Sequence, residues 1–155
     1  LEEYFGRGHY IVTKNIFTLL IEYLGSCGKS ITFAESCTGG LIASAFTSVS
    51  GASAILNGSF VTYSNEIKDE WLGVRKETLA RYGAVSRECV QEMADGAMRR
   101  SGADIAIAVS GIAGPTGAVP GKPVGTVYLC IINSGEKRVR RVFLPGDRVA
   151  IQERT

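Results

Sequence analysis

Apolar and polar residues recur along this chain with the periods of both helices and strands. Apolar residues at helical spacing from about Val12 to Leu24 predict an amphipathic helix that ends near Gly25. The segment Asp104–Ser110 is almost continuously apolar, as is typical of a central strand buried on both faces. Further strands are predicted at Ile31–Ala34, Phe60–Tyr63, Gly125–Ile132 and Arg138–Leu144.

Helices are predicted between most of these strands. They cover about Gly39–Val49, Asn65–Leu72, Lys76–Arg81 and a segment that follows the N-cap residue Ser86 and ends near Arg100. Helices interleaved with strands, and a final hairpin, favour the α/β class. We expect a three-layer α/β/α sandwich with a mixed, mostly parallel sheet of about five strands, formed by a single domain over residues 1–155.

The composition of the chain argues against several classes of protein. The 155 residues are 45% hydrophobic and 21% charged, with a net charge of +2 and no basic run, so we expect no requirement for nucleic acid. No apolar run approaches the roughly 18 residues of a membrane span, and the start has no signal-peptide pattern. Four cysteines without a CxxC motif and one histidine indicate reduced thiols and no metal site. We therefore expect a cytoplasmic protein that needs no cofactor and does not associate with a membrane.

The segment Thr32–Ala43 carries the strongest chemical signal. It reads as a strand that ends in a polar turn and opens directly into a helix. Ser36 and Cys37 are two potential nucleophiles at the bend. The helix start at Thr38, Gly39 and Gly40 is expected to offer free backbone N–H groups, which suit a phosphate or an oxyanion.

Several motifs, in order, resemble the CinA C-terminal domain, the competence/damage-inducible family. The resemblance covers about Leu19 to Arg148. It rests on Ala34–Gly40, Val61–Asn65 with Lys68, Gly83–Ser86, Gly111–Pro115, Lys122–Val127 and Gly146–Arg148.

This resemblance implies an α/β/α fold and a nicotinamide-nucleotide amidase activity. Such an enzyme converts nicotinamide mononucleotide and water to nicotinic acid mononucleotide and ammonia, usually without a metal. Two departures from the family pattern are expected. The molybdopterin-binding-like domain that many members carry before this one is absent, and the C-terminal helix that usually follows Arg148 is missing.

Amide hydrolysis without a metal needs a nucleophile and a base. His9 lies in a weakly patterned N-terminal arm, so Lys68 and Tyr63 are the available choices. The hypothesis is a Ser–Lys amidase in which Ser36 attacks, Lys68 accepts the proton and Tyr63 relays or orients it. From the residues alone, the simpler interpretations are that Ser36 is a turn serine, Tyr63 a strand aromatic and Lys68 a solvated helix lysine.

Cys37 is the rival nucleophile, because thiolates near helix N-termini are activated. Neighbouring residues on an extended strand point to opposite faces, so only one of Ser36 and Cys37 is expected to face the pocket. Ser36 is the preferred choice, with Cys37 packing inward as a small apolar residue.

The phosphate of the substrate needs its own partners. The candidates are the Thr38–Gly40 helix start, the loop residues Gly111, Ala113 and Gly114, and the cations Lys122 and Arg148. Arg148 could instead cap a helix. Glu35 is expected to orient other groups or to form a salt bridge, and Ser86 has a structural interpretation as an N-cap.

Two functions of different classes remain open. The first is an amidohydrolase that acts on a pyridine mononucleotide. The second is a non-catalytic nucleotide-binding or regulatory module, linked to competence or DNA damage, whose loops hold a phosphate without turnover. A homodimer is expected only because two-fold dimers are common.

Overall fold

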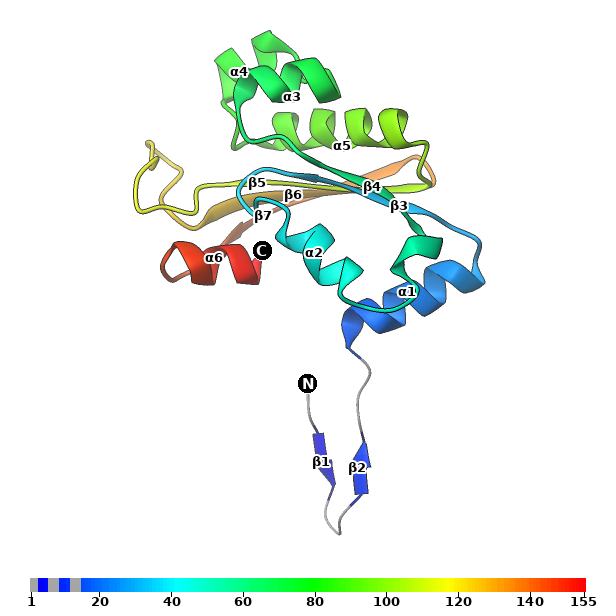
Figure 1. Cartoon of the computed structure of the whole chain (residues 1–155). Helices are drawn as coiled ribbons and strands as arrows, with labels where there is room; N and C mark the ends of the chain where they lie inside the picture. The colour runs from blue at the N-terminus through cyan, green and yellow to red at the C-terminus, as the bar shows by residue number, and fades with distance from the viewer. Residues whose placement is uncertain (1–2, 6–8, 12–14) are drawn as a thin grey trace.

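A five-stranded sheet forms the middle layer of the computed structural model, which describes residues 3–5, 9–11 and 15–155 (Figure 1). Its order is β4-β3-β5-β6-β7, and β3 pairs in parallel with β4 and β5. The pairs β5–β6 and β6–β7 are antiparallel. The strands are β3 (Ile31–Glu35), β4 (Leu56–Val61), β5 (Ile105–Gly111), β6 (Thr126–Asn133) and β7 (Glu136–Phe143).

The prediction of a mixed sheet of about five strands is therefore confirmed. The sheet is also mostly parallel in strand direction, because β3, β4, β5 and β7 run one way and β6 alone among the described strands of this sheet runs the other way. A loop joins β5 to β6 and a hairpin joins β6 to β7, and no crossover helix carries the chain back to make these strands parallel.

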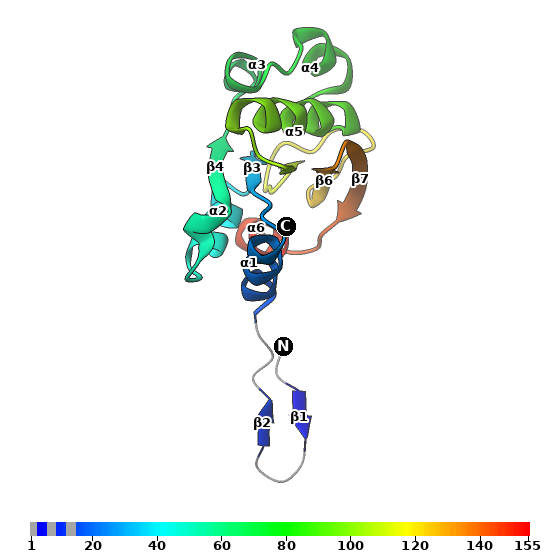
Figure 2. The same cartoon turned by 90° about the vertical axis from the view of Figure 1, so that its right-hand side faces the viewer.

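Helices cover both faces of the sheet, as the two orthogonal views show (Figures 1 and 2). One face carries α5, with α3 and α4 outside it, and the other face carries α1, α2 and α6. This arrangement confirms the three-layer sandwich. The helices are α1 (Ile16–Ser26), α2 (Leu41–Thr47), α3 (Asn65–Leu72), α4 (Lys76–Tyr82), α5 (Arg87–Ser101) and α6 (Arg148–Arg154), with a 3₁₀ turn at Ala52–Ala54.

Capping residues explain where several helices begin. Asn15 accepts a hydrogen bond from the Phe17 backbone N–H at the start of α1, so the helix begins later than the expected Val12; residues 12–14 lie outside the described residues. Ser86 caps α5 as predicted.

The N-terminal β1 (Glu3–Phe5) and β2 (His9–Ile11) form a separate antiparallel pair.

The expectation of a missing C-terminal helix is wrong. Asp147 accepts a hydrogen bond from the Ala150 backbone N–H at 2.9 Å, and α6 begins at Arg148. The aspartate is a good N-cap, and Ile151 of the short helix is fully buried against the sheet. The helix therefore forms within the residues that follow Gly146.

Two apolar layers hold the sheet between the helices. On one face, α5 packs small and apolar side chains such as Ala94 and Met93 onto Ala106 and Ala108 of β5. On the other face, Phe46 of α2 packs on Phe33 of β3 with ring centroids 5.3 Å apart. Small residues on the first face allow α5 to lie close to the strands, so this face is tightly packed.

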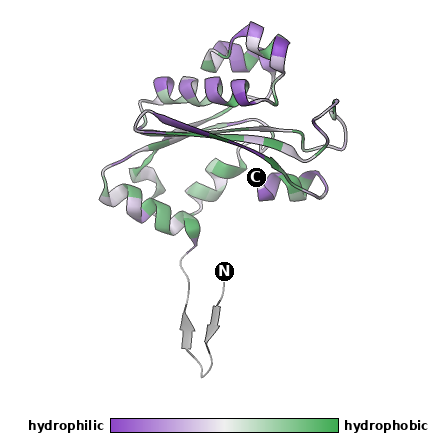
Figure 3. Cartoon of the chain, turned by 180° about the vertical axis from the view of Figure 1, so that it is seen from behind, coloured by the Kyte–Doolittle hydropathy of each residue, from purple (hydrophilic) through white to green (hydrophobic). Residues whose placement is uncertain are grey.

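Helix α1 also exposes an apolar face. Ile21 and Leu24 are buried, whereas Ile16, Leu19 and Tyr23 are exposed, and Figure 3 shows the hydrophobic character of this helix. The predicted homodimer, if it uses this face, would cover these side chains; it stays a prediction.

The described helices include none that is long and apolar enough to cross a membrane. The four cysteines are free.

The close approach of α5 to α3 depends on Gly96. A Cβ atom at this position would lie 2.0 Å from the carbonyl oxygen of Leu72, a backbone atom that cannot move aside. We expect Gly96→Ala to lower the free energy of unfolding by about 2 kcal/mol or more, despite the better helix propensity of alanine. Urea denaturation followed by circular dichroism measures the change.

Gly25→Ala is the matched control. Gly25 also lies in a helix, but a Cβ atom there meets nothing nearer than 4.0 Å. Alanine should leave stability unchanged or raise it by up to about 1 kcal/mol. Equal stability of the Gly96→Ala and wild-type proteins would contradict the proposed packing constraint.

Candidate active site

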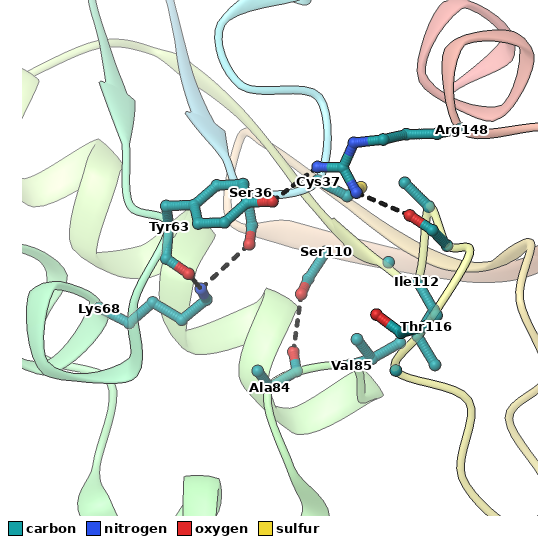
Figure 4. Close-up of a pocket in the computed structure, with 14 residues that line it drawn as sticks. Ser36, Cys37, Tyr63, Lys68, Ala84, Val85, Ser110, Ile112, Thr116 and Arg148 are labelled. Carbon is teal, nitrogen blue, oxygen red and sulfur yellow. Dashed lines mark hydrogen bonds between the residues drawn. The ribbon is translucent and has the colours of Figure 1, made fainter.

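A cavity of about 300 Å³ opens at the carboxyl ends of the parallel strands β3, β4 and β5 (Figure 4). This edge of an α/β sheet is where such folds bind ligands, because the loops that follow parallel strands meet there. The cavity is lined by Ser36, Cys37, Tyr63, Lys68, Ala84, Val85, Ser110, Gly111, Ile112, Ala113, Gly114, Thr116, Gly117 and Arg148.

Ser36 and Lys68 meet directly in this cavity. Ser36 follows the last residue of β3, and its backbone N–H donates to the Val109 carbonyl of β5 at 3.1 Å. Lys68 lies in α3, and its Nζ donates to Ser36 Oγ at 3.0 Å. The two residues are 32 positions apart in the sequence, so the fold itself creates this contact.

The Lys68 amine is held by two backbone carbonyls as well. Its Nζ donates to the Thr62 carbonyl at 2.7 Å and to the Tyr63 carbonyl at 3.2 Å. Only 1% of the Lys68 surface is exposed, and burial lowers the pKa of the amine below its ordinary value. After loss of a proton, two N–H groups can stay on the carbonyls while the lone pair faces Ser36 Oγ. The solvated-lysine interpretation is therefore wrong.

Cys37 is in a different environment from Ser36. The residue is 5% exposed, and it belongs to an apolar cluster with Ala113, Val127 and Ile151. Burial raises the pKa of the Cys37 thiol to about 11, so the thiol stays protonated near neutral pH. It also lines the cavity, so both neighbouring side chains reach it. A protonated Cys37 thiol is a poor nucleophile, whereas the Lys68 amine lies 3.0 Å from Ser36 Oγ. Both observations support Ser36 as the nucleophile.

A buried carboxylate shapes the turn that presents Ser36. Glu35 is fully buried, and its oxygens accept hydrogen bonds from backbone N–H groups and one hydroxyl at the start of α2, and from a second hydroxyl in β4. This explains why the short helix α2 begins there, since a negative charge at a helix N-terminus is favourable. The donors are Thr38 Oγ1 at 2.7 Å, the N–H groups of Gly40, Ile42 and Ala43 at 3.0, 3.1 and 2.9 Å, and Ser59 Oγ at 3.4 Å.

The expectation of free N–H donors at this helix start is therefore corrected. The Gly40 N–H donates to Glu35, and the Gly39 N–H donates to the Ser36 carbonyl at 3.2 Å. Thr38, Gly39 and Gly40 also lie outside the lining of the cavity. The internal carboxylate occupies the place that a phosphate was expected to take, because it is attached one residue before Ser36.

Arg148 brings a positive charge to the cavity. As the first residue of α6 it does not cap a helix C-terminus; its guanidinium donates to the Gly114 carbonyl at 2.8 Å and to the Tyr63 hydroxyl at 2.7 Å (Figure 4). The predicted loop residues Gly111, Ala113 and Gly114 line the cavity too. Arg148 therefore joins the end of β4 to the loop that follows β5.

Two predicted residues have other surroundings than expected. Tyr63 is 61% exposed as a whole residue, and its hydroxyl contacts Arg148, so its predicted role as a proton relay stays a prediction. Lys122 lies outside the cavity, and its Nζ donates to the Tyr82 carbonyl at 2.7 Å. The loop folds back toward α4, which carries Lys122 away from Ser36.

Sequence reasoning missed other lining residues. Ser110 is the penultimate residue of the strand β5, and its Oγ donates to the Ala84 carbonyl at 2.8 Å, which fastens the segment before α5 to the sheet. Its place after an apolar run was the available signal, whereas nothing marked Thr116.

In the part of the chain that the structure describes, no group of three or more histidine, cysteine, aspartate or glutamate residues is arranged to hold a metal ion.

Known proteins similar to this chain carry the name CinA. The family model of the CinA C-terminal domain matches residues 13–155. A CinA-like protein of Kosmotoga olearia is 44% identical over 150 residues, which are 95% of this chain and 36% of the relative. One of Thermotoga neapolitana is 46% identical over 151 residues, 96% of this chain and 37% of the relative. The chain spans roughly a third of the length of these curated relatives.

Solved structures give the same result for the fold. The competence damage-inducible protein A of Klebsiella pneumoniae has a TM-score of 0.87 and 41% identity, covering 89% of this chain and 86% of that one. A competence/damage inducible protein of Agrobacterium tumefaciens has a TM-score of 0.85 and 43% identity, covering 88% and 84%. These names describe a biological setting, and they state no reaction.

The cap formed by Glu35 generates a prediction. In Glu35→Gln, an amide with one acceptor oxygen and an NH₂ group faces three backbone N–H groups that all need an acceptor. We expect the free energy of unfolding to fall by about 2 kcal/mol or more, measured by urea denaturation. Glu77→Gln, at an exposed acid in the first turn of α4, should change it by less than about 0.5 kcal/mol. Similar losses in both variants would contradict the special role of Glu35.

Proposed function

The chain belongs to the CinA C-terminal domain family, and we propose that it hydrolyses the amide of a pyridine mononucleotide with Ser36 as nucleophile and Lys68 as base. The reaction that the resemblance implies is conversion of nicotinamide mononucleotide and water to nicotinic acid mononucleotide and ammonia. The observation that carries the proposal is the 3.0 Å contact between Ser36 Oγ and the buried Lys68 Nζ.

Formation of an ester begins the reaction. Neutral Lys68 accepts the Ser36 proton as Ser36 Oγ bonds to the amide carbon, and the carbonyl oxygen becomes negatively charged. The ammonium formed on Lys68 lies next to this charge and stabilises it. Lys68 then gives its proton to the leaving nitrogen, the C–N bond breaks, and ammonia departs.

Hydrolysis of the ester completes the cycle. Water attacks the carbonyl carbon, and Lys68 accepts a proton from that water. When the ester bond to Ser36 Oγ breaks, the proton returns to Ser36 and the carboxylic acid leaves. The two carbonyls of Thr62 and Tyr63 keep Nζ in place throughout, so the same amine serves as base and acid in both halves.

The opposite wall supplies a partner for the phosphate. The Arg148 guanidinium has five N–H donors, and its contacts with the Gly114 carbonyl and the Tyr63 hydroxyl leave others for an anion. A cavity of about 300 Å³ is at the small end of the range for ligand sites. We therefore propose that a mononucleotide binds with its phosphate near Arg148 and its amide near Ser36.

The catalytic pair gives the first test. We expect purified wild-type protein to release ammonia from nicotinamide mononucleotide, and Ser36→Ala and Lys68→Met each to lower kcat by at least about 10²-fold. Methionine keeps the length of the lysine chain but cannot accept a proton. A coupled assay for ammonia measures the rate, and circular dichroism checks the fold.

Lys76→Met is the control for this test. Lys76 lies on the surface of α4, contacts Asp69 and is not part of the cavity lining, so full activity is expected. Normal turnover in a folded Lys68→Met protein would contradict the proposed base. Binding of the nucleotide by calorimetry without ammonia release would favour a binding module instead.

The lowered pKa of Lys68 gives the second test. Only the neutral amine accepts the Ser36 proton, so kcat should rise with pH and level off above an apparent pKa below lysine's ordinary 10.5. Stability should also rise with pH. Between the lowered pKa of Lys68 in the folded protein and its ordinary pKa in the unfolded chain, the unfolded chain binds more protons, so the free energy of unfolding increases with pH. A pH series of initial rates measures the first effect and urea midpoints the second.

Lys68→Met should remove this rise of stability with pH, while Lys76→Met should keep it. Lys68→Arg should be inactive over the whole pH range, because an arginine does not lose its proton in proteins. A rate that does not change with pH, or one that falls as pH rises through this range, would show that Lys68 does not act as the base.

A further inference from the structure

A second surface pocket is lined by residues of α4, the start of α5, the loop after β5, and strands β6 and β7. Its volume is about 500 Å³. Nothing in the proposed reaction uses this pocket. It is lined by Arg81, Tyr82, Ser86, Arg87, Glu88, Lys122, Tyr128 and Arg141.

Positive charge dominates this lining. Four of its residues are cationic and one, Glu88, is acidic, which gives a local charge of about +3, compared with +2 for the whole chain. The cations come from different segments: α4, α5, the loop after β5, and β7. The fold therefore gathers charges that lie far apart in the sequence.

These cations lack the carboxylate partners that other basic residues have. Arg75, Lys76, Lys137 and Arg138 each form an ion pair with an acidic side chain. Among the described residues, no ion pair within 4.0 Å involves Arg81, Arg87, Lys122 or Arg141. Glu88 does not neutralise any of them by direct contact.

Neutral groups hold several of these cations in place instead. The Arg81 guanidinium lies 5.2 Å from the centre of the Tyr82 ring, and that of Arg141 lies 5.8 Å from the centre of the Tyr128 ring. Lys122 donates to the Tyr82 carbonyl, and Arg141 donates to the Gly121 carbonyl. Aromatic faces and carbonyls orient a cation without cancelling its charge.

We propose that this pocket binds an oligophosphate group. An anion with two or more phosphates has enough charge and enough acceptor oxygens to satisfy cations on several sides of a 500 Å³ pocket. The start of α5, a helix of 15 residues, adds the positive end of its dipole. Lys122, which the sequence suggested as a phosphate ligand, then holds a phosphate in this pocket and not beside Ser36.

Calorimetric titration tests the proposal without any need for turnover. Inorganic pyrophosphate is titrated into the full chain and into the double variant Arg87→Gln/Arg141→Gln at one fixed ionic strength. We expect the Kd to rise roughly tenfold or more in the double variant, since two charge-assisted contacts are lost. Arg87→Gln alone should give a smaller increase of the same sign.

The matched control removes two charges from the other face of the same strand. Side chains alternate along β7, and Val139 packs in the apolar cluster under α5, whereas Val142 packs in the cluster beside α6. Arg138 and Arg140 therefore point away from the side that carries Arg141. Arg138→Gln/Arg140→Gln lowers net charge equally but should leave the Kd within about twofold.

The outcomes separate the possible explanations. Absence of pyrophosphate binding to the wild-type chain, or equal weakening in both double variants, would overturn the proposal. Loss of binding in Arg148→Gln would also overturn it, because the anion would then occupy the candidate active site. Unchanged binding in that variant supports a separate pocket, whether or not the chain hydrolyses an amide.

The source of the phosphates is resolved by two further titrations. Adenosine diphosphate carries the same two phosphates on a nucleoside, and adenosine carries none. Tighter binding of the diphosphate than of pyrophosphate indicates a nucleotide site, and equal binding indicates that phosphate groups alone are recognised. Binding of adenosine with the same affinity as the diphosphate would contradict an electrostatic site.

Discussion

The buried carboxylate of Glu35 is the constraint on which the active-site geometry depends. Its side chain binds the first turn of α2 and so fixes the bend that carries Ser36. Its backbone carbonyl accepts a hydrogen bond from the Thr62 N–H at 2.9 Å, which fixes the end of β4 against the end of β3. The Thr62 carbonyl then accepts from Lys68. A single residue thereby positions both members of the proposed catalytic pair.

The fold could be predicted largely from sequence because its signals are local. Capping residues and turn glycines determine where Asn65–Leu72 and the helix after Ser86 begin and end. The relative direction of strands is a longer-range property, and here it depends on whether a crossover helix follows β5. The short helix α6 was missed because its one strong signal, Asp147 as N-cap, stands close to the end of the sequence.

The candidate site was predictable only in part, for a related reason. Motifs identified Ser36, Lys68 and Arg148 as residues of interest, and these do line one cavity. Sequence does not show which groups are already satisfied inside the chain, so the donors of Gly40 seemed available for a phosphate. It also does not show how a loop folds back, and for that reason sequence alone could not show that Lys122 lies outside the lining of this cavity.

Tyr63 serves the two halves of the cavity through separate groups. Its backbone carbonyl holds the Lys68 amine, while its side-chain hydroxyl contacts Arg148 on the opposite wall. Any residue at this position supplies the carbonyl, but only some supply the hydroxyl. Exchange of this one side chain would therefore change the wall of the cavity near Arg148 while the backbone contact with the proposed base persists. Support of the proposed base and the shape of the opposite wall thus depend on different atoms of one residue.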